Sequence, residues 1–240
     1  MSLLDLLARV ENGLNNCDSF EGLDTLERQE VDEDAIPAFI EAGLCPAGEA
    51  EFGNDKYANL DTREVKGWDL GIFYDLATGI GDWAFSFQGS FYTKYEQTPG
   101  DLASLIKDAQ DAGTIPSNYE IVGLGDLLKR DGNQEEKMNV RLRWDKNQWG
   151  ASLAWFYLGD FYQSSLTLDD GTRYKIPSHS YLNASIDYDF DIGRSNTRLR
   201  FGINNLTDNR APLADRYFGY YSDAHRDYGR SFYFDVRVAF

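Results

Sequence analysis

The 240-residue sequence lacks any run that approaches the roughly 20 consecutive apolar residues of a membrane-spanning helix. Only 42% of its residues are hydrophobic, and its mean hydropathy is -0.50. The opening residues, MSLLDLLARV, lack the basic start and the long apolar stretch of a secretory signal. These absences exclude a helical membrane protein and, taken alone, indicate a cytoplasmic one.

Positive charge is also scarce. The chain has 23 Lys and Arg against 40 Asp and Glu, and the net charge of -17 argues against nucleic acid as a partner. Residues 1–60 carry 14 acidic residues against three basic ones, so we expect an acidic region over 1–61 and a second region over 62–240. Within the acidic region, 3–14 and 34–44 have the pattern of short amphipathic helices, the second with Pro37 near its start and Gly43 near its end.

Residues with catalytic or metal-binding chemistry are few and scattered. His179 and His225 stand alone, without the clustered ligands of a metal site. No Ser-His-Asp arrangement or glycine-rich phosphate loop is evident, and acidic pairs such as Asp169–Asp170 and Glu135–Glu136 are typical of solvated turns and strand ends. We therefore expect no enzymatic activity, no catalytic residue, no metal and no cofactor.

The chain has two cysteines, Cys17 and Cys45, and no CxxC motif. A disulfide between them would close a loop of about 29 residues and could stabilise the fold by roughly 3–4 kcal/mol. Two free thiols in a reducing cytosol are the alternative. Counting cysteines does not decide between the two.

Aromatic residues, by contrast, make up 15% of the chain, and from residue 62 onward apolar and polar residues alternate. In KMNVRLRW (137–144) every second residue is apolar and the residues between are polar. A period of two indicates β-strands with two unlike faces. Seven segments share the pattern: 67–76, 83–95, 137–144, 149–157, 181–190, 197–204 and 228–240.

The polar face of these segments is densely charged. It carries Asp69, Asp75, Lys94, Arg141, Arg143, Asp187, Arg198, Arg200, Asp235 and Arg237. Because burying unpaired charge is costly, such a face suits a water-filled or polar lumen rather than a dry core. A soluble lipocalin-like binder would need the inverse arrangement, with the apolar face inside.

The connections between the segments alternate in length. Short turns rich in Gly, Asp and Asn lie at 77–82, 145–147 and 191–195, whereas long links span 96–135, about 160–175, and 207–227. Strictly sorted short turns and long loops are typical of an outer-membrane β-barrel. Within the first long link, 101–113 has the apolar spacing of a short helix, which we expect to cover the mouth of such a barrel.

Aromatic residues of the apolar face gather near the short turns and the C-terminus, as in the girdle where hydrocarbon meets lipid headgroups. They are Tyr74, Trp83, Trp144, Trp149, Phe190 and Phe240. The sequence thus predicts an all-β fold: an antiparallel transmembrane β-barrel segment of about seven strands, with long extracellular loops carrying short helices.

Two stretches resemble a known family. RLRFGINNLTDNRAPLADRYFGYYSDAHRDYGRSFYFDVRVAF (198–240) and REVKGWDLGIFYDL followed by GIGDWAFSFQGSFY are similar to the C-terminal part of a TonB-dependent outer-membrane receptor. The resemblance covers about 57–240, and an acidic, Cys-paired loop like 1–56 also occurs in such receptors. It implies an oxidising route to the outer membrane, and hence a disulfide between Cys17 and Cys45.

The resemblance also implies partners. Alternate residues of the last strand, namely Phe232, Phe234, Val236, Val238 and Phe240, resemble the signal read by the barrel assembly machinery, although the usual glycine lies further upstream, at Gly229. We expect outer-membrane lipid and a small-molecule ligand as partners. Family members have 22 strands, a plug domain and a TonB-binding segment, so contact with the TonB complex would run only through N-terminal parts that this sequence lacks. The expected protein is therefore the last third of a receptor.

The expected function is TonB-coupled uptake of a scarce nutrient such as a ferric siderophore, cobalamin or a saccharide. Ligands of the family are captured by extracellular loops and the upper lumen, and the last loop offers Arg210, Arg216, Tyr217, Tyr220, Tyr221 and His225 as candidates. Two alternatives are the lipocalin-like soluble binder and a small stand-alone outer-membrane barrel, either an adhesin or an enzyme. The latter would need an eighth strand from residues 1–60, which contain no clear alternating run.

Overall fold

The computed structural model describes residues 26–53, 62–115 and 124–239. The expected helix over 3–14, Cys17 and Phe240 lie outside these ranges. The chain divides into two compact units, one comprising 1–63 with 97–125 and the other comprising 64–96 with 126–240. Segment 97–125, expected as a link between strands, thus groups with the N-terminal residues.

The first unit contains short elements. Strand β1 (Leu26–Arg28) pairs antiparallel with β2 (Ala50–Gly53), and a 3-10 turn, η2 (Glu33–Ala35), leads into helix α2 (Ile36–Glu41). The Asp32 side chain accepts a hydrogen bond from the Asp34 N–H and so begins this helical stretch, while Pro37 occupies its first turn. Helix α3 (Asp101–Asp111) forms in the segment where apolar spacing predicts one. The helices expected over 34–44 and 101–113 are therefore confirmed.

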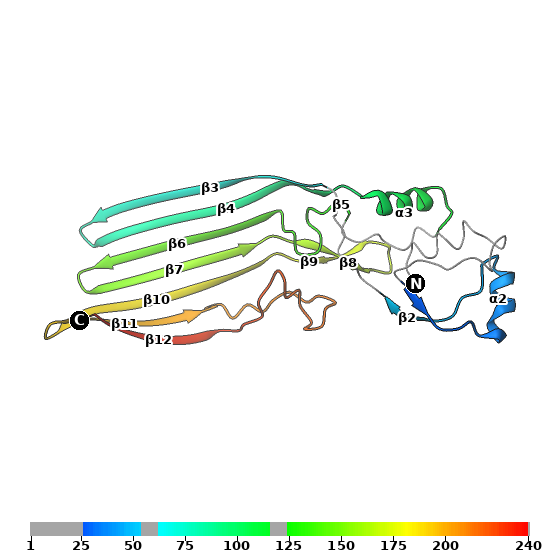
Figure 1. Cartoon of the computed structure of the whole chain (residues 1–240). Coiled ribbons are helices and arrows are strands. Elements are labelled where there is room, and N and C mark those ends of the chain that lie inside the picture. Colours follow the sequence, from blue (N-terminus) through cyan, green and yellow to red (C-terminus); the bar gives the residue numbers. More distant parts are fainter. Residues whose placement is uncertain (1–25, 54–61, 116–123, 240) are drawn as a thin grey trace. The chain divides into compact units, whose positions relative to one another are not determined.

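The second unit is a sheet of long antiparallel strands. They are β3 (Arg63–Thr78), β4 (Gly81–Gln97), β6 (Glu136–Lys146), β7 (Trp149–Leu158), β10 (His179–Ile192), β11 (Ser195–Asn204) and β12 (Ser231–Ala239). Their order across the sheet is β12-β11-β10-β7-β6-β4-β3, and the two-residue β5 (Gly125–Asp126) pairs with β4 (Figure 1). Every predicted strand coincides with one of the seven long strands.

Two-residue turns join β3 to β4, β6 to β7 and β10 to β11. Asn147 and Gly193 adopt positive φ values of 52° and 63° in the second and third turns, as tight hairpins with the twist of a sheet require. All three turns lie at the same end of the sheet, where β12 also ends (Figure 1). The expected sorting of short turns to one end is present.

The register places like residues in rows across the strands. One row of the apolar face runs through Trp83, Trp144, Ala151, Ile186, Phe201 and Phe234. A row of the opposite face runs through Asp145, Gly150, Asp187, Arg200 and Asp235. Because successive side chains of a strand point to opposite faces, the alternation in sequence becomes one apolar and one charged wall.

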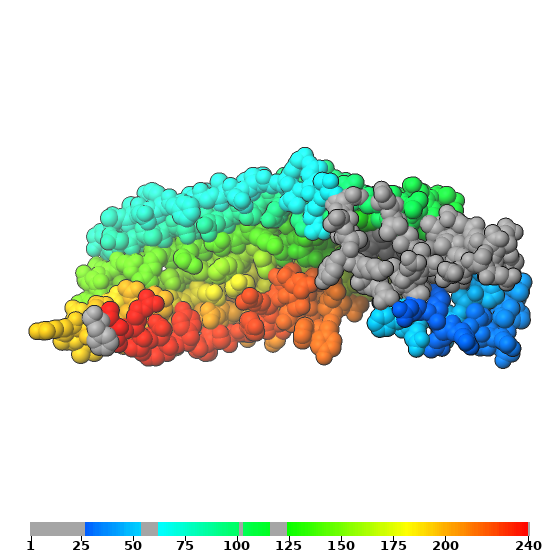
Figure 2. Space-filling view, viewed as in Figure 1, coloured from blue at the N-terminus to red at the C-terminus, as the bar shows by residue number. Residues whose placement is uncertain are grey.

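The sheet is open. Strands β3 and β12 end the pairing order, and they form opposite margins of the space-filled sheet, in cyan and red (Figure 2). Every residue of β12 is exposed. An open antiparallel sheet whose strands have one apolar and one charged face, as predicted for an outer-membrane barrel, is a partial barrel.

The link at 160–175 is more ordered than the sequence predicts. It forms a separate hairpin of β8 (Phe161–Thr167) and β9 (Arg173–Ile176), with a register shift between Gln163 and Thr167. Phe161, Gln163 and Ile176 lie on one buried face, but this face includes the polar Gln163 while the aromatic Tyr162 is exposed on the other, so hydrophobicity does not alternate although burial does. Period-two analysis therefore misses it.

Candidate functional site

The polar face is held together by an ion pair between β6 and β10. Arg143 donates from Nη1 and Nη2 to the two carboxylate oxygens of Asp187 at 2.6 and 2.9 Å, and its Nε donates to Asp145. The Asp187 side chain is only 1% exposed. Two parallel N–H···O bonds in fork geometry make this a strong, directional pair.

Gly150 on the intervening strand β7 makes this contact possible. A Cβ at this position would lie 2.1 Å from Arg143 Nη2 and 2.5 Å from Asp187 Oδ2. The guanidinium therefore crosses the space that any side chain on Gly150 would fill. Gly150 is needed for the close approach of the guanidinium and not for its backbone conformation, because its φ is not positive.

Further charges pair along the same face. Arg198 binds Asp189 at 2.6 and 2.7 Å, while its register partner on β12 is a second cation, Arg237. On β3 and β4, Lys94 bridges Glu64 and Glu96 at 2.5 and 2.6 Å. Of the charges predicted for the lumen, Lys94, Arg143, Asp187 and Arg198 thus take part in cross-strand ion pairs.

Between the carboxylates and the long links lies a cavity of about 480 Å³. Small residues form its floor, among them Ser152, Ala154 and Ser185. Arg141, Arg143, Arg198 and Arg200 line it, together with Asn183, Asn204, Phe156 and Tyr233, and no carboxylate does. The cavity is therefore lined by arginines, of which Arg143, Arg198 and Arg200 are paired with carboxylates behind the lining.

The long links of the second unit are packed on one another. Phe161 of β8, Ile176 of β9 and Tyr221 of the last loop form a buried cluster, with the Phe161 and Tyr221 rings edge to face at 5.2 Å. Gln163 bonds the last loop twice, donating to the Asp215 carbonyl at 2.7 Å and accepting from the Asp215 N–H at 3.0 Å. The last loop is therefore anchored on the β8–β9 hairpin.

His225 is buried within this assembly. It is 2% exposed, stacks on Phe161 at 5.6 Å and meets the His179 ring edge to face at 5.7 Å. Neither ring nitrogen has a hydrogen-bond partner among the described residues. Desolvation, helped by the neighbouring His179 and Lys137, lowers the pKa of His225 to about 4, so the ring is neutral at pH 7.

The other predicted ligand residues of the last loop differ in accessibility. Tyr217 is 95% exposed and stands edge to face on Phe218 at 5.0 Å, whereas Tyr221 is 3% exposed. Arg216 donates to the Tyr221 hydroxyl at 2.7 Å and covers its ring at 4.5 Å. Tyr220 pairs with Leu213 in an isolated bridge, which makes the loop tip a small hairpin.

Arg210 is engaged in an ion pair. It donates from Nε to Asp227 at 2.8 Å, and the same carboxylate accepts from the Ala211 N–H. The guanidinium lowers the pKa of Asp227, and the carboxylate raises that of Arg210. Of the six predicted ligand residues, Tyr217 is the most accessible to a ligand from solution, and Tyr221 and His225 are the least.

Neither a metal centre nor a membrane helix is found where the structure can be described. No group of three His, Cys, Asp or Glu residues there could hold a metal ion. Likewise, none of the described helices combines the length and the apolarity needed to cross a membrane.

The unlike walls, the sorted turns and the open antiparallel sheet agree with a comparison to protein families. The model of the TonB dependent receptor-like, beta-barrel family matches residues 24–206, more than half of the chain. The chain belongs to this family. No curated protein gives a significant match to it.

The match runs from β1 to the start of the last loop and so includes six of the seven long strands of this receptor barrel. TonB-dependent receptor barrels reside in the outer membrane, and the family is one of transporters and receptors rather than enzymes. Two features of the receptor chain are not predicted from its sequence. They are the anchoring role of Gln163 and the exposed Phe218 beside Tyr217, which adjoining aromatic residues in the last loop could have signalled.

Proposed function

We propose that the chain is part of the barrel wall of an outer-membrane receptor that takes up a scarce small molecule with TonB-coupled energy. The observation that carries this proposal is the pair of unlike walls on the same strands. Paired charges and an arginine-lined cavity occupy one face, and aromatic and aliphatic rows occupy the other. A wet lumen inside and lipid outside satisfy both walls.

The proposed topology places the three short turns and the end of β12 at the periplasmic rim. The acidic region 1–61 and the links at 96–135, 160–175 and 207–227 then face outside. The interlocked β8–β9 hairpin and last loop support this arrangement, since they hold Tyr217 and Phe218 at an exposed tip that an arriving ligand meets. The ligand is a ferric siderophore, cobalamin or a saccharide.

The two alternatives fit less well. A lipocalin-like binder would keep the apolar wall inside, which would leave the charged wall and its cavity in solvent with no ligand-binding role. A stand-alone barrel would need additional membrane strands of about nine to eleven residues. In the described part of the first unit, β1 and β2 have three and four residues. Closure of the sheet is therefore proposed to come from further strands of a larger receptor, which also supplies the contact with TonB.

Uptake by cells tests the proposal. Accumulation of labelled ferric siderophores, cobalamin and oligosaccharides would be compared in cells with and without the complete receptor, each with and without a functional TonB. We expect one ligand class to accumulate only when both are present, and Tyr217→Ala with Phe218→Ala to weaken its capture while receptor abundance stays constant. Recovery of the receptor outside the outer-membrane fraction would refute the proposal.

A further inference from the structure

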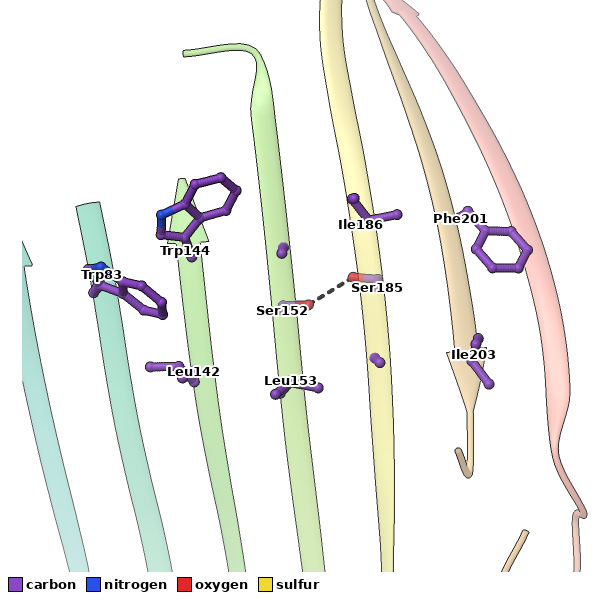
Figure 3. A pocket seen from close by; sticks show the side chains of 11 residues that line it. Trp83, Leu142, Trp144, Ser152, Leu153, Ser185, Ile186, Phe201 and Ile203 are labelled. Atoms are coloured by element: carbon purple, nitrogen blue, oxygen red, sulfur yellow. Dashed lines mark hydrogen bonds between the residues drawn. The ribbon is translucent and has the colours of Figure 1, made fainter. Parts of the chain in front are cut away.

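The apolar wall contains a groove of about 510 Å³ that begins at Trp83 and Trp144, near the short turns, and extends across the strands to Ile203, near the opposite end of β11. Its floor is formed by Ala151 of β7 and Ala184 of β10, which are set diagonally by the register. In the row of Ala151 the neighbours are Trp144 and Ile186, and in the row of Ala184 they are Leu153 and Ile203. Two small residues among large ones thus leave the groove open across β7 and β10 (Figure 3).

The walls of the groove are fixed. Trp144 donates from Nε1 to the Ile80 carbonyl at 3.0 Å, which ties the indole to the β3–β4 turn and satisfies its polar group. The Trp83 ring lies 6.4 Å from it, centroid to centroid. On the side toward the turns, Trp149 and Tyr188 are in contact at 4.7 Å. The groove is therefore formed before any occupant arrives.

The lining of the groove is almost entirely apolar. Ser152 and Ser185 border it, but they follow Ala151 and Ala184 and belong to the polar face, where their hydroxyls bond to each other at 2.8 Å, as the dashed line shows (Figure 3). The rest of the lining is alanine, leucine, isoleucine, phenylalanine and tryptophan. An occupant with polar atoms would lose their hydrogen bonds there, so the groove fits a hydrocarbon chain.

A single cation stands at the end of the groove toward the turns. Lys146 follows Trp144 by two residues and therefore points to the same face. Its Nζ donates to the Gly79 carbonyl at 3.2 Å, and it pairs with no carboxylate within the described residues. On the outward positions of β4, β6, β7, β10 and β11 the one other charge is Glu136, at the far end of β6. Lys146, the aromatic residues and the apolar groove thus follow one another along the wall. The phosphate, the glycerol region and the acyl chain of a phospholipid have the same order.

We infer that the groove binds one acyl chain of an anionic phospholipid whose phosphate is held by Lys146. The inference rests on the proposed function, because it requires the apolar wall to face lipid. In a membrane the hydrophobic effect gives no preference for one apolar surface over another, since lipid tails are themselves apolar. Selectivity must come from closer van der Waals contact in the preformed groove and from the charge at Lys146.

Native mass spectrometry tests the acyl-chain part. The complete receptor would be inserted into vesicles of phosphatidylglycerol and phosphatidylethanolamine, extracted in mild detergent and weighed with its retained lipid. We expect one retained phosphatidylglycerol, and an occupancy at least tenfold lower when Ala151→Leu and Ala184→Leu fill the groove. Ala154→Leu, the same change on the opposite face of β7, should leave the occupancy unchanged. Equal retention in the filled and unfilled receptors would overturn the inference.

Recognition of the lipid headgroup is tested with the groove residues unchanged. Lys146→Gln should lower the preference for phosphatidylglycerol over phosphatidylethanolamine at least fivefold, while Arg194→Gln, which removes a cation from the β10–β11 turn, should not. If the filled-groove variant fails to fold, an unchanged preference in Lys146→Gln overturns the inference by itself. A groove-dependent second copy in place of lipid would also overturn it. A wild-type receptor that inserts and takes up its ligand but retains no phosphatidylglycerol selectively refutes the groove alone, whereas failure of the wild-type receptor to insert into vesicles refutes the proposed function.

Discussion

At the scale of the residue, Gly150 decides how the charges of the polar wall are paired. Arg143 and Asp187 belong to strands that are not neighbours, and β7 lies between them. Their ion pair closes only because β7 has no side chain where the guanidinium crosses. A buried carboxylate left without its cation is costly, so the absence of one methyl group stabilises the wall.

Gly150→Ala should therefore destabilise the receptor by about 2–3 kcal/mol, because the new Cβ displaces Arg143 from the buried Asp187. The free energy of unfolding of the complete receptor in vesicles, from urea titration, measures the effect. Gly79→Ala is the matched control, since nothing lies within 4 Å of its added Cβ. Equal stability of the two variants would show that the ion pair tolerates a side chain there.

The second residue-scale prediction concerns the cysteines. Cys45 is 1% exposed, and Cys17 lies outside the described residues. The pairing of Cys17 with Cys45 thus stays a prediction, supported by an oxidising route to the outer membrane. Peptide mass spectrometry of the unreduced protein should find the two cysteines in one linked pair. Two free thiols would contradict both the disulfide and an extracellular position for residues 1–56.

At the scale of the element, each long strand has an apolar face, which excludes charge, and a polar face, which accepts it. Leu142 of β6 and Val236 of β12 lie on the apolar wall, and Asn139 of β6 lies on the polar one. If lipid covers the apolar wall, its strands tolerate charge on one side only.

Leu142→Arg and Val236→Arg should each cost about 2–4 kcal/mol near the middle of the bilayer, whereas Asn139→Arg should cost close to nothing. Folding titrations of the complete receptor into vesicles would measure all three. Neutral outcomes at both apolar positions would mean that this wall does not face lipid.

The last loop is an element whose packing depends on pH. The folded-state pKa of His225, about 4, lies below the ordinary histidine pKa of 6.5, so the unfolded loop binds the proton more tightly. The stabilisation is therefore complete above pH 6.5 and is lost as the pH falls toward 4. Between pH 7 and pH 5 the loss should be about 2 kcal/mol.

Hydrogen exchange of the amides in 211–225 measures this loss. Local opening should increase at pH 5 in the wild-type protein, after correction for the intrinsic exchange rate, and His225→Gln should remove most of the dependence. An exchange profile of the wild-type loop that stays flat between pH 7 and pH 5 would contradict a buried neutral histidine.

At the scale of the whole molecule, the short turns share one end of the sheet with the end of β12, so one rim of the barrel is made of tight turns. In the proposed topology the long links are the parts of this chain that meet the medium. Tyr217 and Phe218, 95% and 65% exposed, are the most accessible aromatic pair of the last loop.

Chymotrypsin added to intact cells should therefore cleave the complete receptor beside Tyr217 or Phe218 and within 96–135. The turns at 79–80, 147–148 and 193–194 should stay intact until the outer membrane is opened. Mass spectrometry of the released peptides identifies the sites. Cleavage near 147–148 in intact cells, with 96–135 protected, would invert the topology.

The seven long strands, their two faces, the short turns and the helices at 34–44 and 101–113 are all predictable from the amino-acid sequence. These features are local. Alternation within a strand, turn residues and helical spacing act over a few neighbouring residues, so they can be read without knowing what lies opposite.

Contacts between residues far apart in the sequence, by contrast, are seen only in the folded chain. Arg143 and Asp187 are 44 residues apart, and Gln163 and Asp215 are 52 apart. The sequence predicts Tyr217, Tyr221 and His225 equally as ligand residues. In the structure the β8–β9 hairpin buries Tyr221 and His225 and leaves Tyr217 exposed. The alanine groove likewise exists because the register sets Ala151 and Ala184 diagonally. Register and burial arise from packing between distant segments, and no local pattern encodes them.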